Sequence, residues 1–247
     1  MTAAALVFSL CLVQSVPSQP SVKIVTTTSD EMFPASWRKD PVNAGAQELE
    51  KSEVSRSIAI VSRALALYPN DFLEKELKTV YVCKSIKFYG LSYGGTNSLD
   101  AVYLTNQGSE QGYTDKYIFG SFHHEFSSVL LRNHPDQLDA RQWSKSNPVG
   151  FRYGDGGTEA LRSGKASTEY EATLAKRGFL TEYSQASLEE DFNMIVEGMF
   201  SGDPVFWQFC GRFPKLAKKQ QLAAEFYRKL VPGFTSTFFR SRPRFPK

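Results

Sequence analysis

The chain has 247 residues, of which 41% are hydrophobic and 13% aromatic, and its formal net charge is +3. This length and apolar content predict a globular domain with a substantial core and exclude a disordered chain. The net charge is small and the basic residues are spread along the sequence, so the composition argues against a nucleic-acid-binding protein.

The first twenty residues predict an export signal. An apolar run from Ala3 to Val13 is followed by a polar, proline-rich stretch. A run of about eleven residues is too short to span a bilayer but fits the hydrophobic segment of a secretory signal. We therefore expect a secreted or periplasmic protein with no stable membrane insertion after signal removal. Two cysteines, Cys83 and Cys210, then remain and can form one disulfide at most.

The remaining chain divides by composition into three parts. Residues 21–45 are rich in Ser, Thr, Pro and Asn and predict an extended lead-in. Residues 46–235 carry the periodic apolar patterns and form the expected domain. Residues 236–247 contain a basic, proline-containing end, which is typical of a solvated tail.

The early part of the domain predicts one helix and then strands. Apolar residues recur at helical spacing from Gln47 to Tyr68, and Pro69 ends the run. Residues 78–90 and 101–105 are rich in β-branched and aromatic residues, which predicts two strands.

The later part of the domain predicts helices. The patterns indicate helices at about 119–132, 188–200 and 216–230, with a glycine-rich linker at 147–164. Strands that come early and helices that follow predict an α+β fold.

The helix at 119–132 contains "HEFSS" (124–128), an altered zinc-hydrolase motif. Zinc hydrolases place His-Glu-x-x-His on one helix, so that two imidazoles hold the metal and the glutamate activates its water. Here His124 and Glu125 occupy the first two positions and Ser128 the fifth. Helical spacing puts Phe122 and Phe126 on the buried face and predicts that His124 and Ser128 face a cleft.

With these motifs the chain resembles the small gluzincin metallopeptidases, zincin-like enzymes in which strands precede a His-Glu helix. The family's third zinc ligand is a Glu on a later helix, and the matching "EDFNM" implies Glu190. A Tyr seven residues earlier steadies the oxyanion in the family, which implies Tyr183. The resemblance thus implies zinc as cofactor, a peptide substrate, Glu125 as general base and His124, Glu190 and Ser128 around the metal. Ser128 departs from the family, because a serine hydroxyl is a poor zinc ligand at neutral pH.

Other interpretations of these residues stay open. Ser187 and Glu190 fit a capping box, which alone would account for Glu190. If a metal is bound, the alternatives for the ligand that takes the place of the second imidazole are His134, Asp191, Glu189 and water.

His123 does not replace it easily, because it lies about 100° from His124 around the helix.

Three functions compete on this evidence. The first is a secreted zincin-like metallopeptidase, and the second is a pseudo-enzyme on the same fold that binds peptides. The third is an unrelated exported α+β protein whose aromatic cluster "FWQFCGRF" (206–213) binds sugars or a partner. A weak or degenerate metal site is favoured over a working peptidase, because of Ser128.

Overall fold

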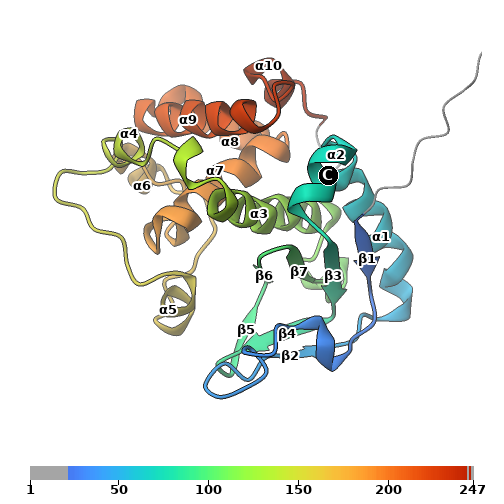
Figure 1. Ribbon diagram of the computed structural model, residues 1–247. Coiled ribbons are helices and arrows are strands. Elements are labelled where there is room, and N and C mark those ends of the chain that lie inside the picture. Colours follow the sequence, from blue (N-terminus) through green and yellow to red (C-terminus); the bar gives the residue numbers. More distant parts are fainter. Residues whose placement is uncertain (1–21, 244, 246–247) are drawn as a thin grey trace, which may run out of the picture.

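The computed structural model describes residues 22–243 and 245. Its main sheet has four strands in the order β1-β3-β7-β6 (Figure 1). These strands are β1 (Lys23–Val25), β3 (Thr79–Cys83), β7 (Ala101–Thr105) and β6 (Gly95–Asn97). The first three run parallel, and β6 pairs antiparallel with β7 at one edge. The strand predicted at 101–105 is confirmed.

A second, three-stranded sheet has the order β2-β4-β5 and consists of β2 (Gly45–Gln47), β4 (Ser85–Phe88) and β5 (Leu91–Tyr93). The single strand predicted at 78–90 is therefore wrong, since its residues form β3 and β4 in different sheets. The chain turns between them at Lys84, whose amide donates to the carbonyl of Gln47. β-propensity is high on both sides of this turn and gives no sign of it.

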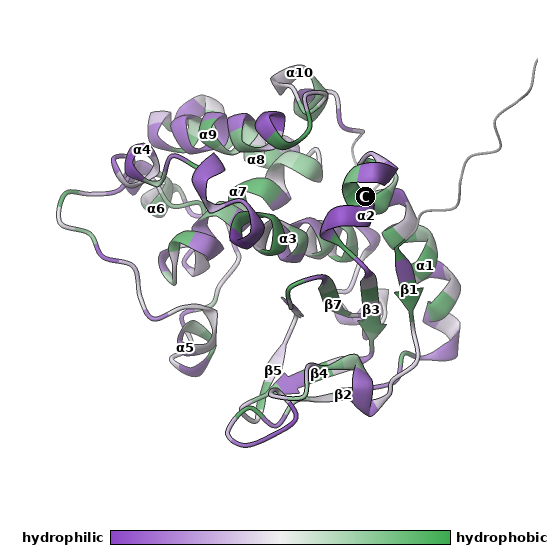
Figure 2. Cartoon of the chain, viewed as in Figure 1, coloured by the Kyte–Doolittle hydropathy of each residue, from purple (hydrophilic) through white to green (hydrophobic). Residues whose placement is uncertain are grey.

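The two faces of the main sheet pack against different partners. Val80 and Val102 belong to the large core shared with the helices. Their neighbours Tyr81 and Tyr103 point the other way, into a smaller core shared with the second sheet. This alternation follows from the two-residue period of a strand. β3 and β7 are mainly hydrophobic along their length, as expected for strands buried on both faces (Figure 2).

The long helices form the other half of the molecule. α1 (Lys51–Leu65) and α3 (Asp115–Asn133) pack against each other, and α3 packs in turn against β7 and α7 (Leu188–Phe200). α8 (Pro204–Arg212) and α9 (Pro214–Leu230) complete this half. The helix predicted at 188–200 is confirmed, and those predicted at 119–132 and 216–230 begin a few residues earlier. The α+β fold is therefore confirmed, with a small early sheet followed by helices.

The short elements connect these parts. They are η1 (Asp30–Met32), α2 (Asn70–Glu76), η2 (Ser109–Gln111), η3 (Pro135–Gln137), α4 (Ala140–Ser144), α5 (Gly157–Arg162), α6 (Ala172–Arg177), η4 (Tyr183–Gln185) and α10 (Ser236–Arg240). Among the described residues, no helix is long and apolar enough to cross a membrane.

Three expected segments differ from the structure or lie outside it. The lead-in at 21–45 is not merely extended, because β1 joins the main sheet through Thr79 and its neighbours. The expected tail begins with α10, whose Phe239 is buried in the large core. The export signal predicted at 1–20 lies outside the described residues and stays a prediction. Cys83 and Cys210 are both buried and free.

Candidate functional site

His124 and Glu125 lie on α3 and face a cavity. Thr114 caps the helix by accepting a hydrogen bond from the amide of Tyr117. Phe122 and Phe126 are fully buried, as their spacing predicts. His124 and Glu125 point away from the face that carries these two phenylalanines, and both line the cavity.

Glu190 comes to the same place from the first turn of α7. The Ser187 side chain accepts a hydrogen bond from the Glu190 amide at 3.0 Å, so half of the predicted capping box is present. The Glu190 carboxylate turns away from the cap. Its Oε1 accepts a 2.7 Å hydrogen bond from the Tyr183 hydroxyl, and its Oε2 lies 3.0 Å from His124 Nε2. The structure thus brings His124, Glu190 and Tyr183 together.

Both nitrogens of His124 have a carboxylate partner. Nε2 contacts Glu190, and Nδ1 lies 3.3 Å from Oε2 of Glu197. Burial alone would lower the pKa of His124, but the hydrogen bonds to Glu190 and Glu197 outweigh it and hold this pKa well above 6.5. His124 is therefore an imidazolium that donates from both nitrogens.

Glu197 is a site residue that was not predicted from the sequence. It follows Glu190 by seven residues, which is two turns on the same helix face, and this spacing is the signal that could have found it.

Glu125 lies beside the edge strand β6. Its Oε2 accepts a 2.8 Å hydrogen bond from the Asn97 amide. A Cβ on Gly95 would lie 2.6 Å from Glu125 Oε1, so a larger residue would force this carboxyl group to move. Burial raises the pKa of Glu125 to about 7, against the opposing effects of His124 and Asn97. Asn97 is a second site residue that sequence analysis missed.

The prediction that Ser128 faces the cleft is wrong. Its side chain is only 2% exposed and lies between α3 and α7. Ser128 Oγ accepts a 2.7 Å hydrogen bond from Nδ2 of Asn193. The periodicity of α3 places Ser128 near His124 but does not show where α7 crosses, and that crossing covers the serine.

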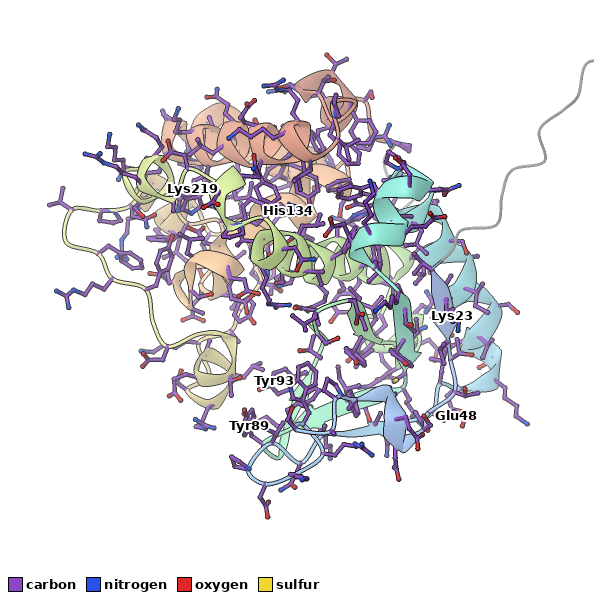
Figure 3. The ribbon with its side chains drawn as sticks, viewed as in Figure 1. Lys23, Glu48, Tyr89, Tyr93, His134 and Lys219 are labelled. Carbon is purple, nitrogen blue, oxygen red and sulfur yellow. The ribbon has the colours of Figure 1, made fainter. Side chains whose placement is uncertain are left out.

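The proposed substitutes for the missing imidazole are engaged elsewhere. His134 lies at the end of α3, where its Nε2 is 2.8 Å from Glu76 (Figure 3). Glu189 is half exposed and lies 3.8 Å from Arg132.

Asp191 is fully buried, and its Oδ2 accepts hydrogen bonds from Lys219, Tyr153 and Trp143. This network anchors the start of α7 and does not enter the cavity.

His123 points into the aromatic core. Its Nδ1 lies 2.8 Å from the Tyr68 hydroxyl, and its ring stacks on Phe200 at 4.1 Å between centroids. Burial lowers the pKa of His123 well below 6.5, so it is neutral. It has no access to the cavity that His124 lines.

The cavity has a volume of about 250 Å³ and three walls. The first wall is formed by β5, β6 and the residue between them, with Tyr93, Gly94 and Gly95. The second wall is α3, with Tyr117, Ser121, His124 and Glu125. The third wall is the segment around α5, with Leu161, Ala166 and Thr168, and Tyr183 and Glu197 also line the cavity. The Tyr93 hydroxyl donates a 2.8 Å hydrogen bond to Thr158 of α5, which links the first wall to the third.

The residues present do not fit a three-ligand zinc site. A catalytic zinc takes three protein ligands and a water. The described residues contain no group of three or more His, Cys, Asp or Glu side chains that could hold a metal ion. The Ser128 hydroxyl is committed to Asn193, so it does not complete a set of three ligands with His124 and Glu190.

Comparisons with known proteins support the fold. No protein-family model matches the sequence, and no curated protein matches it. A solved structure of a putative zinc-binding metallo-peptidase from Bacteroides caccae is similar, with a TM-score of 0.53 and 14% sequence identity. The similarity covers 90% of this chain and 87% of that protein. At this identity the similarity shows a shared fold alone.

Proposed function

We propose that the protein binds an extended segment of another polypeptide, on a zincin-like fold that no longer holds a catalytic zinc. The observation that carries the proposal is the contact between Ser128 and Asn193. It buries position 128, where a peptidase of this fold needs its second imidazole. His124 and Glu190 alone provide two ligands, which is one fewer than a catalytic zinc requires.

The ion pair of His124 gives the site a stable arrangement without metal. The imidazolium lies between Glu190 and Glu197, and Tyr183 donates to the same Glu190. These charge-assisted hydrogen bonds are partly shielded from water and hold the side chains in place. The cavity therefore has fixed polar walls, which is what a binding site needs.

The edge strand supports a peptide as the ligand. β6 ends the main sheet, and the cavity begins at Gly94 and Gly95. An extended peptide can add to such an edge through main-chain hydrogen bonds, and pockets beside the strand then select its side chains. A small ligand would need no strand edge.

Metal content tests the proposal. Protein purified without chelators is expected to contain zinc far below one ion per chain, and added zinc is expected to leave its thermal unfolding unchanged. The variant Ser128→His with Asn193→Ala restores the imidazole and makes room for it, so it is expected to bind zinc. The control Asn193→Ala alone keeps the serine and is expected to stay metal-free. One zinc per chain in the native protein would contradict the proposal.

A second candidate is a hydrolase with a weakly held divalent ion. It is favoured by the 3.0 Å between His124 Nε2 and Glu190 Oε2. Two ligands of one tetrahedral zinc lie about 3.3 Å apart, so little movement would be needed. The resemblance gives Glu125 as base and Tyr183 as oxyanion donor in such an enzyme. Glu125→Ala should abolish any metal-stimulated proteolysis; unchanged turnover in this variant would end this candidate.

A further inference from the structure

A second cavity lies next to the first and shares Tyr93 with it. Its volume is about 180 Å³. It is lined mainly by Trp37, Val42, Phe88, Tyr89, Tyr93 and Thr96. We call it the aromatic pocket. An apolar cavity of about 150 Å³ can hold benzene, so the aromatic pocket has room for one aromatic side chain.

The walls of the aromatic pocket are fixed by ring packing. Trp37 meets Phe88 at 5.5 Å between centroids and a right angle, and Phe88 meets Tyr93 at 5.2 Å. Edge-to-face contacts of this kind are favourable and directional. Because these rings already contact one another, a ligand side chain would enter preformed walls.

Tyr89 is the exposed wall of the aromatic pocket. It is 43% exposed, and Figure 3 shows it near Tyr93 at the same end of the small sheet. Tyr89 and Gly90 form the two-residue turn between β4 and β5, with φ angles of +55° and +76°. Glycine or asparagine adopts such angles more easily than tyrosine. The turn alone therefore does not account for an aromatic residue at position 89.

The two cavities lie on opposite faces of the edge strand β6. Gly95 and Asn97 lie on the face of β6 that meets Glu125. Thr96 lies opposite Tyr103 in the register, on the other face, and lines the aromatic pocket. A peptide added along β6 would alternate in the same way. Side chains an odd number of residues apart would then enter different cavities.

The first cavity has the charge for a basic side chain. The carboxyl groups of Glu125 and Glu197 line it, and that of Glu190 lies beside them, within 3.0 Å of His124 Nε2. None of the described residues that line it is lysine or arginine. We propose that the peptide carries a lysine or arginine for this cavity and, one residue away, an aromatic side chain for the aromatic pocket. This inference rests on the proposed function and names its ligand.

Four labelled hexapeptides test the inference by fluorescence anisotropy. The parent contains Lys-Phe between alanines and glycines. The second has alanine for phenylalanine, the third has alanine for lysine, and the fourth has alanine inserted between the two. The native protein is expected to bind the parent at least about tenfold more tightly than each of the others, since each loses one buried side chain.

The variant Tyr89→Gly tests the pocket without disturbing the fold, because glycine suits the positive φ angle at this turn. It is expected to lower affinity for the parent peptide and leave affinity for the phenylalanine-free peptide unchanged. Val149→Ala, at a fully exposed position, is the control and is expected to bind all four as the native protein does.

The outcomes separate this inference from the proposed function. Equal binding of all four peptides, or phenylalanine-dependent binding that Tyr89→Gly keeps, would overturn the inference and leave peptide binding standing. Binding of none of them would overturn both.

Discussion

Asn193 donates its side-chain amide to Ser128 at the place where α7 crosses α3, three residues after Glu190 on the same helix. One helix therefore brings a carboxylate to His124 and also closes the neighbouring position. With position 128 closed, the two remaining candidate ligands, His124 and Glu190, contact each other directly. The consequences of this contact can be measured without a ligand.

The chain has three histidines, and two of them are expected to differ sharply in protonation. His124 should remain an imidazolium well above pH 6.5, because Glu190 and Glu197 hold its proton. His123 should remain neutral well below pH 6.5, because it is buried among aromatic rings. Imidazole nitrogen shifts measured by NMR across this range check both, with His124→Gln assigning the signal. A His124 that titrates near 6.5 would contradict the ion pair.

Glu125 is expected to make stability depend on pH. Its pKa is 4.5 in the unfolded chain and about 7 in the folded protein, so the folded state keeps the proton longer. The stabilisation is fully present below pH 4.5 and is lost as pH rises through about 7. The loss is roughly 3 kcal/mol for this group.

Urea unfolding at pH 5 and pH 8 measures this dependence. Glu125→Gln cannot ionise and can still accept from Asn97, so it should be more stable than the native protein at pH 8 and similar to it at pH 5. Equal gains at both pH values would mean that the effect is not ionisation.

The helices could be predicted from the sequence because their evidence is local. The apolar spacing of α3 and the Ser187 cap of α7 lie within the elements themselves. The contact between His124 and Glu190 could not be predicted from local patterns, because 66 residues separate them and no periodicity connects them. Only the resemblance to a known family implied it.

What could not be predicted depends on packing between elements. Ser128 is buried by α7 and not by any feature of α3. Trp37 lies in the segment expected to be a lead-in, so the aromatic pocket had no local signal.

The buried pair of Asp191 and Lys219 is expected to be costly to break. Both side chains are fully buried and 2.5 Å apart. Lys219→Met would leave Asp191 without its cation and should lower the free energy of unfolding by about 3–5 kcal/mol.

Adding Asp191→Asn to Lys219→Met removes the stranded charge and should recover part of that loss in urea unfolding. Lys78→Met, which breaks the exposed pair with Asp100, is the control and should change little. A double variant less stable than Lys219→Met alone would contradict this account.

Gly157 lets α5 approach the ion pair. A Cβ at this position would lie 2.3 Å from the Tyr183 hydroxyl and 2.5 Å from Glu190 Oε1. Gly157→Ala should therefore push these two groups apart and destabilise the fold by about 1–3 kcal/mol. Gly211→Ala is the matched control, because it lies inside α8 with no other atom within 4 Å of the added Cβ. It should be neutral or gain up to about 1 kcal/mol from helix propensity. If both variants unfold at the same urea concentration, α5 does not lie against Tyr183 and Glu190 as described.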